Sequence, residues 1–278
     1  MTVASDHNGR STSHIDAQPM TVAIVLDKSG SMEPLREAVI DAYNRFLGEL
    51  GTEGEELRVS LTSFDTSFHH LYVAEPLASV PPLRYDDYQP GGMTALFDAI
   101  AHTTLETDRQ LRAVAHDQAK VLVAVITDGA ENSSTDYDAV QLAALVADYE
   151  SRGNWTFVYL GTDATLSDAQ HVSARMGIKA GNAMRWDASE GAARATMGSL
   201  AKAAKVRRAA PGKRSDQVFA DAGQSEEDYS GSGDATAPRL PHSPPRPASR
   251  RRPLQKRSLR EELDEVTASK PGNPEASR

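Results

Sequence analysis

TVAIVLDKSGSM, residues 21–32, predicts both the fold class and the place of a binding site. Its first part is a near-continuous apolar run rich in β-branched residues, which is typical of a strand buried on both faces of a parallel sheet. The run stops at Asp27, and Ser29 and Ser31 follow with a glycine between them. Because ligands bind at the carboxyl ends of the strands in open α/β sheets, these three side chains are candidate ligands.

Strand and helix patterns alternate from this stretch to about residue 205. Five further strands are predicted, at 56–66, 68–77, 120–128, 154–162 and 183–187. Helices are predicted from Pro34 to about 50, from Thr94 onward with Thr94 as the N-cap, and near 137–151, 166–176 and 189–205. This alternation predicts a doubly wound, mostly parallel, six-stranded α/β sheet. The runs at 56–66 and 68–77 are too close together for a helical crossover, so they are predicted to pair as an antiparallel hairpin at one edge.

These elements predict where individual side chains point. The helix near 137–151 is expected to face the sheet with Val140, Ala144, Leu145 and Tyr149. Trp155 and Trp186 flank strands and are expected in or near the core. His69 and His70 are adjacent on one strand, so they are expected to face opposite sides and to share no metal.

Composition divides the chain into a leader at 1–19, a folded domain at 20–205 and a disordered, proline- and arginine-rich tail at 206–278. The tail contains PHSPPRPASRRRPLQKRS, residues 241–258, which offers almost nothing to bury. Its net charge is +3 whereas the rest of the chain carries −12. The acidic body argues against nucleic-acid binding by the folded part, since contact with phosphates needs a positive surface.

Composition also excludes several kinds of site. The 278 residues include no cysteine, which excludes disulfides, thiolate metal sites and cysteine nucleophiles. No run approaches the roughly 18 to 20 apolar residues that a membrane span needs, and the leader lacks the apolar segment of a secretory signal. A cytoplasmic protein is therefore expected, with a monomer as the default state.

Three predicted loops offer oxygen ligands at the same edge of the sheet. Asp27, Ser29 and Ser31 follow the first strand, Thr94 lies in GGMTALFD, and Asp128 ends the strand that closes with ITDG. Since the carboxyl ends of neighbouring parallel strands converge, Asp27 and Asp128 are expected to lie close together. A set of carboxylates and hydroxyls without histidine or cysteine favours Mg²⁺, with Mn²⁺ or Ca²⁺ as substitutes.

With these residues the sequence resembles the von Willebrand factor A (VWA) domain family, whose metal-ion-dependent adhesion site (MIDAS) has Asp-x-Ser-x-Ser, a distant Thr and a distant Asp. All five positions are filled, by Asp27, Ser29, Ser31, Thr94 and Asp128. The resemblance covers roughly residues 20–205 and looks most like the intracellular bacterial and phage VWA proteins, in which LDxSGSM, GGxTALxDAI and ITDGxENSS recur. It implies the Rossmann-like VWA fold.

The resemblance also implies roles for the five residues. Ser29, Ser31 and Thr94 would contact the cation directly, and Asp27 and Asp128 would act largely through water. A Glu or Asp of a protein partner would complete the coordination. The function expected first is therefore a Mg²⁺-dependent protein-binding module.

Two other functions remain open at this stage. One is a regulatory or scaffold subunit of an ATPase, metal-chelatase or stress-response complex, with the tail as a second contact. The other is a Mg²⁺-dependent phosphohydrolase. Such enzymes place a second Asp two residues after an aspartyl nucleophile, and this chain has Ser29 there. No Gly-x-Ser-x-Gly, P-loop or Gly-x-Gly-x-x-Gly motif follows a strand either, so a non-enzyme is expected.

A structural reading of the same residues also remains. Asp27 and Asp128 would cap neighbouring helices while the serines satisfy a turn. Glu131, Asn132 and Ser133, which follow Asp128, are candidates for lining a partner surface.

Overall fold

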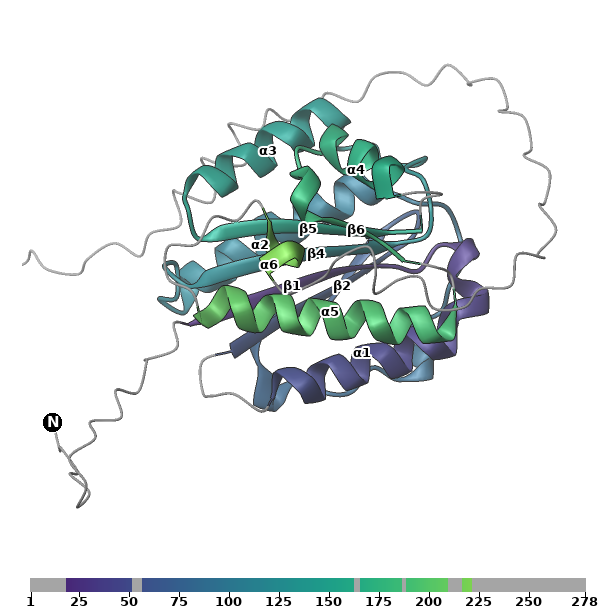
Figure 1. The fold of residues 1–278 in the computed structure, drawn as a ribbon, viewed down its shortest axis with the longest axis horizontal. Helices are drawn as coiled ribbons and strands as arrows, with labels where there is room; N and C mark the ends of the chain where they lie inside the picture. The colour runs from purple at the N-terminus through teal and green to yellow at the C-terminus, as the bar shows by residue number, and fades with distance from the viewer. Residues whose placement is uncertain (1–18, 52–56, 163–165, 187–188, 210–216, 222–278) are drawn as a thin grey trace, which may run out of the picture.

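The computed structural model describes residues 19–51, 57–162, 166–186, 189–209 and 217–221 (Figure 1). The predicted leader, apart from its last residue, and the tail beyond residue 221 lie outside the described residues. The described part forms three layers, a central sheet with helices on both faces.

The sheet has six strands in the order β3-β2-β1-β4-β5-β6. Their bounds are β1 Met20–Asp27, β2 Leu57–Phe64, β3 Phe68–Pro76, β4 Lys120–Thr127, β5 Trp155–Gly161 and β6 Ala183–Arg185. Every neighbouring pair is parallel except β2 and β3, which pair antiparallel at one edge. The predicted doubly wound, six-stranded sheet with one antiparallel edge strand is therefore confirmed.

The central strands are apolar on both sides because helices cover both faces. All eight residues of β1 are buried, as are all eight of β4. Val22, Ile24 and Leu26 pack on one side of β1, whereas Ala23 and Val25 pack on the other. This two-sided burial is why the sequence shows a continuous apolar run rather than alternation.

The helices divide between the two faces (Figure 1). Their bounds are α1 Arg36–Leu50, α2 Leu96–Ala113, α3 Ala139–Ser151, α4 Leu166–Arg175, α5 Glu190–Ala209 and α6 Val218–Asp221, with 3₁₀ turns η1 Gly30–Leu35, η2 Leu77–Ser79, η3 Tyr85–Asp87 and η4 Ala180–Asn182. Helices α1 and α5 contribute to the core on one face, and α2, α3 and α4 to the core on the other. No helix in the described part of the chain is long and apolar enough to cross a membrane.

The predicted inward face of α3 is right for Leu145 and Tyr149 and wrong for Val140 and Ala144, which are exposed. Val140 is 79% exposed, and the buried face consists of Leu142, Leu145, Val146 and Tyr149. Asp138 is the N-cap, and its side chain accepts hydrogen bonds from the backbone N–H groups of Val140 and Gln141. The first turn of the helix is thereby oriented with Val140 toward solvent.

The folded part continues past the boundary predicted at residue 205. Helix α5 ends at Ala209, and its last turn is held by Lys120, whose Nζ donates to the carbonyls of Arg207 and Arg208 at 3.0 and 3.1 Å. Helix α6 then packs Val218 and Phe219 into the core on the α5 side of the sheet. The predicted boundary therefore falls inside α5.

Both tryptophans are buried, as predicted, with Trp155 and Trp186 at most 2% exposed. His69 and His70 make contacts on different sides of β3. The side chain of His69 lies near Ser67 Oγ, at 3.4 Å, whereas His70 Nδ1 lies 2.8 Å from Thr62 Oγ1. The expectation that they share no metal agrees with this placement.

Candidate metal centre

The five predicted ligand residues meet where β1 and β4 end. Asp27 is the last residue of β1, and Asp128 directly follows β4, which pairs with β1. Thr94 lies in the loop before α2. Asp27, Ser29 and Thr94 are at most 3% exposed, whereas Ser31 is exposed and Asp128 is half-buried. The cluster is therefore closed on the side of the core and open on the side of Ser31 and Asp128.

Direct contacts link three of the five side chains. Ser31 Oγ donates to Asp128 Oδ1 at 2.6 Å. Ser29 Oγ lies 3.2 Å from Ser31 Oγ, within hydrogen-bond distance. The serines after β1 and the acid after β4, 97 residues apart in the chain, thus form one chain of contacts.

Gly129 shows that the remaining two side chains face the same space. A Cβ atom placed on Gly129 would lie 3.1 Å from Thr94 Oγ1, 3.6 Å from Asp27 Oδ2 and 3.7 Å from Ser29 Oγ. Oxygens from the end of β1 and from the loop before α2 thus lie around one point beside Gly129, in the segment after β4. The structure brings together all five residues that the sequence predicted.

Both carboxylate oxygens of Asp27 accept hydrogen bonds, but its buried negative charge is still unfavourable. Its Oδ1 accepts from the backbone N–H of Ser29 at 2.7 Å, and its Oδ2 accepts from Thr127 Oγ1. Burial nevertheless raises the pKa of Asp27, because loss of water outweighs these hydrogen bonds, and the nearby charge of Asp128 adds to the rise. Burial likewise raises the pKa of Asp128, against the effect of the Ser31 hydrogen bond. A bound cation would offset the cost of both charges.

The residues present fit a hard divalent cation. No group of three or more His, Asp or Glu side chains in the described residues is placed to hold a metal ion. A cation at this edge would therefore be held by hydroxyls together with the two acids. Hydroxyl and carboxylate oxygens are ligands suited to Mg²⁺, Mn²⁺ or Ca²⁺ rather than to softer metals.

The loop before α2 is fixed against the end of β1. Tyr88 is completely buried, and its hydroxyl donates to the carbonyl of Asp27 at 2.5 Å. The backbone N–H of Gly91 donates to the carbonyl of Lys28 at 2.8 Å. Gly92 has φ +73°, and a Cβ there would come within 2.8 Å of Thr66 Oγ1, so this position favours glycine. The run of proline and glycine therefore forms an ordered turn that places Thr94.

The residues after Asp128 hold Thr94 from the other side. Asn132 Oδ1 accepts from the backbone N–H of Thr94 at 2.8 Å, and the Asn132 N–H donates to the Thr94 carbonyl at 3.0 Å. Glu131 accepts from the backbone N–H of Phe97 at 3.0 Å and from that of Ser133 at 2.9 Å. Glu131 and Asn132 thus act inside the site as positioning residues.

Thr94 is not the N-cap of α2, contrary to the prediction. The helix begins at Leu96 with Ala95 as the N-cap residue, and the first-turn N–H groups are instead satisfied from the loop after β4, by Glu131 and Ser134. The two-sided pairing with Asn132 keeps the Thr94 backbone out of the helix and leaves its hydroxyl facing Gly129.

Asp98 is a further positioning residue that the sequence analysis missed. It is 5% exposed, and its carboxylate accepts from the backbone N–H groups of Thr135, Asp136 and Tyr137 at 2.7 to 3.2 Å. It thereby fixes the loop after β4 to the first turn of α2. The sequence offered one signal for this role: Asp98 lies four residues after Thr94 in the predicted helix and would therefore lie on the same face, near the site.

Comparison with known proteins identifies the fold. No protein-family model matches the sequence, and no curated protein matches it. Among solved structures, the pilus adhesin SpaC from Lactobacillus rhamnosus GG matches with a TM-score of 0.52 at 14% identity, over 69% of this chain and 31% of that chain. The vWF domain of the type V pili tip protein Mfa5 from Porphyromonas gingivalis matches with a TM-score of 0.51 at 12% identity, over 71% of this chain and 98% of that domain.

A third similar structure is proximal thread matrix protein 1 from the mussel byssus, with a TM-score of 0.50 and 16% identity, over 68% of this chain and 46% of that chain. The chain thus spans less than half of the mussel protein and less than a third of the SpaC chain. At these identities the likeness establishes the fold alone. The chain has the fold of VWA domains.

Proposed function

We propose that this chain is a Mg²⁺-dependent protein-binding module with a complete MIDAS. Ser29, Ser31 and Thr94 would bind the cation through their hydroxyls, and Asp27 and Asp128 would support it through water. An acidic side chain of a protein partner would complete the coordination. The observation that carries this proposal is the convergence of hydroxyls and acids from three segments around the point next to Gly129.

The exposure of the site supports a partner rather than an internal ligand. Asp27, Ser29 and Thr94 line the inner side, and Ser31 and Asp128 reach the surface. Three neutral hydroxyls would bring no negative charge into direct contact with the cation, because the two acids act through water and accept hydrogen bonds from Thr127 and Ser31. An anionic oxygen from outside would therefore be bound strongly.

We propose binding rather than catalysis. Two residues after Asp27, where a phosphohydrolase of this kind would need a general acid, stands Ser29, whose backbone N–H donates to the Asp27 carboxylate. A cytoplasmic location stays a prediction, supported by the absence of cysteine.

Isothermal titration of Mg²⁺ into the full-length chain tests the cation half of the proposal. Ser29→Ala and Thr94→Ala are expected to weaken Mg²⁺ binding at least tenfold, because each removes a direct ligand. Ser151→Ala is the matched control, since Ser151 lies at the end of α3 and its hydroxyl donates to the carbonyl of Asp148. Equal Mg²⁺ affinity in all four proteins would refute the proposal.

Two synthetic peptide pools test the partner half. They are identical except that each Glu in one pool is Gln in the other. The immobilised protein is expected to retain the Glu pool in Mg²⁺ and to release it in EDTA, while the Gln pool passes through in both. Retention that is independent of Mg²⁺ would show that the acid does not reach the cation.

A further inference from the structure

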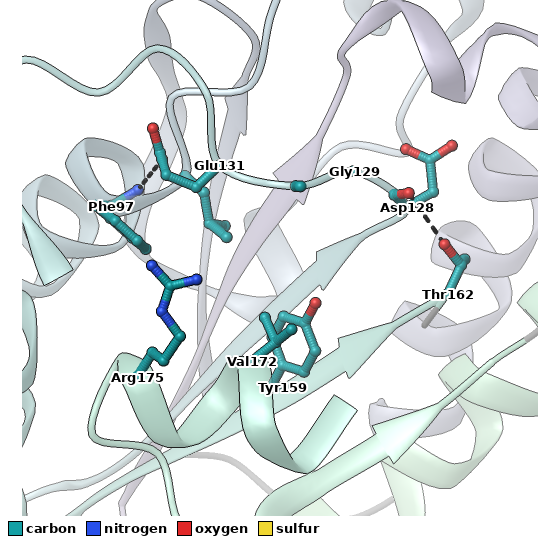
Figure 2. Close-up of a pocket in the computed structure, with 10 residues that line it drawn as sticks. Phe97, Asp128, Gly129, Glu131, Tyr159, Thr162, Val172 and Arg175 are labelled. Carbon is teal, nitrogen blue, oxygen red and sulfur yellow. Dashed lines mark hydrogen bonds between the residues drawn. The ribbon is translucent and has the colours of Figure 1, made fainter. Parts of the chain in front are cut away.

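A cavity of about 320 Å³ lies beside the candidate metal centre, between the loop after β4 and helix α4 (Figure 2). Asp128 and Gly129 line it on the side of the metal centre, and Tyr159 and Val172 provide apolar surface. Figure 2 shows Arg175 extending from the end of α4 toward Phe97, away from Asp128. The volume is at the low end of the range for ligand pockets, which suits one or two side chains rather than a cofactor.

Arg175 is the one cationic residue among the described residues that line this cavity. Its side chain is exposed, and no hydrogen bond or ion pair within the described part of the chain engages it. The acid nearest in the lining, Glu131, is already occupied. Its oxygens accept from the backbone N–H groups of Phe97, Ser133 and Ser134 and from Ser134 Oγ, at 2.7 to 3.0 Å. Arg175 is therefore available to an anion that comes from outside.

With a cation bound next to Asp128, a partner would meet two groups that attract anions, separated by the apolar surface of the cavity. At one end is the metal centre, whose cation would take a carboxylate, and at the other is a guanidinium, which binds carboxylates in bidentate geometry. A cavity of about 320 Å³ holds one or two side chains, so two acids that flank the residue inside it would be two or three positions apart in an extended segment. The charges and the length fit one continuous partner segment.

We infer that the cavity and Arg175 select a partner segment with the order acid, apolar residue, acid. The first acid completes the metal coordination, the apolar side chain packs against Tyr159 and Val172, and the second acid pairs with Arg175. This inference rests on the proposed function and adds to it the sequence class of the partner. It makes Arg175 a specificity-determining residue outside the five MIDAS positions.

A purely structural role for Arg175 predicts something different. Arg175 is the basic residue of the last turn of α4, where a cation interacts favourably with the helix dipole. Its replacement would then lower the stability of the protein but leave the choice of peptide unchanged. Peptide preference therefore separates the two roles.

The test is selection from a random 12-residue peptide display library on the full-length protein, in Mg²⁺ and in EDTA. The proteins are wild type, Arg175→Gln, Arg175→Glu, Ser29→Ala and the control Lys202→Glu. Lys202→Glu makes the same change of charge as Arg175→Glu on an exposed residue of α5, across the sheet from the cavity. Wild type and Lys202→Glu are expected to enrich two acids around an apolar residue, two or three positions apart.

The Arg175 variants are expected to keep the first acid and lose the second. A synthetic peptide from the wild-type pool should bind Arg175→Glu about tenfold more weakly. Replacing its second acid by Gln should weaken binding to wild type but not to Arg175→Gln, as a double-mutant cycle requires. Arg175→Lys should restore part of the loss.

Two other outcomes separate a failure of the inference about the cavity from a failure of the proposed function. If wild type and Arg175→Glu enrich the same single-acid motif in Mg²⁺, the inference about the cavity is overturned and the proposed function stands. If no peptide is enriched in a Mg²⁺-dependent way that Ser29→Ala abolishes, both fail.

Discussion

Asp27→Asn separates a metal centre from a structural cap at the end of β1. Asp27 is completely buried, and burial raises the pKa of its carboxyl despite the hydrogen bonds from Thr127 and Ser29. Between its ordinary pKa and the raised one, the folded state binds more protons than the unfolded state, so stability falls as pH rises. At neutral pH the charge therefore destabilises the metal-free protein. We expect Asp27→Asn in EDTA to be as stable as wild type or more stable.

The size of the effect follows from the contacts. Hydrogen bonds to a charged group contribute about 1.5–3 kcal/mol and neutral ones about 0.5–1.5 kcal/mol, so the variant weakens its two bonds by about 1 kcal/mol each. The raised pKa means that relief of the buried charge exceeds this loss. The Thr127 hydroxyl can also turn, because it lies 3.1 Å from the Gly129 carbonyl as an alternative acceptor.

Magnesium should reverse the order of stability. At a concentration about 100 times the dissociation constant, a cation that binds only the folded state adds about 2.7 kcal/mol. In a domain of this size each kcal/mol raises the melting temperature by about 2–4 °C, so wild type should gain roughly 5–10 °C. Asp27→Asn should gain less than about 2 °C, since the charge that favours the cation is gone.

Scanning calorimetry in EDTA and in saturating Mg²⁺ measures both effects. Asp148→Asn, on the exposed side of α3, is the matched control and should respond to Mg²⁺ like wild type. A loss of more than about 2 kcal/mol in EDTA would show that the Asp27 carboxylate stabilises the fold as a cap. An unchanged Mg²⁺ shift in Asp27→Asn would show that the cation binds without it.

Three further predictions follow from neighbouring contacts. Gly129→Ala places a methyl group 3.1 Å from Thr94 Oγ1. Calorimetric titration should therefore show Mg²⁺ affinity reduced at least tenfold, while the stability of the metal-free protein changes by less than about 1 kcal/mol. Unchanged affinity would contradict the placement of the cation beside Gly129. Asp98→Asn puts an amide where the carboxylate accepts backbone N–H groups, and urea unfolding should show a loss of about 2–3 kcal/mol; wild-type stability would refute its positioning role. Burial lowers the pKa of His70, although the charge of Glu106 opposes this shift. The folded state therefore holds fewer protons than the unfolded state, and stability should fall as pH drops below about 6.5. Urea midpoints should fall less in His70→Gln than in wild type, and an equal fall would contradict this assignment.

The sheet and the meeting of the five proposed ligand residues were predictable because each has a local signal. Buried parallel strands are continuous apolar runs, and the polar residues that end them, such as Asp27 and Asp128, stand out against those runs. The topology of a doubly wound sheet then brings such residues together. The structure agrees with both steps.

The residues that position the site were not predictable in the same way. Tyr88 lies in a loop of proline, glycine and acids, and only the folded loop shows that its hydroxyl reaches the Asp27 carbonyl. Thr127 looks in the sequence like any β-branched strand residue, and nothing local shows that its hydroxyl donates to the Asp27 carboxylate. Asn132 works through the backbone of Thr94, 38 positions away, which no local pattern reveals.

Of two local errors, at the start of α3 and at the end of the domain, only the first had a signal in the sequence. Asp138 followed three residues later by Gln141 is a capping box, which starts α3 at Ala139 and turns Val140 outward. At the other end of the domain, Val218 and Phe219 are two apolar residues in a polar stretch, too few to predict α6 by periodicity. Their burial depends on the surface that the sheet and α5 have already formed.

The most direct measurement is a crystal structure of the full-length protein soaked in Mn²⁺, with anomalous scattering to locate the ion. The account predicts one peak in contact with the hydroxyls of Ser29, Ser31 and Thr94, on the side that Ser31 and Asp128 leave open. A peak elsewhere, or ordered hydroxyls with no peak among them at saturating Mn²⁺, would contradict it.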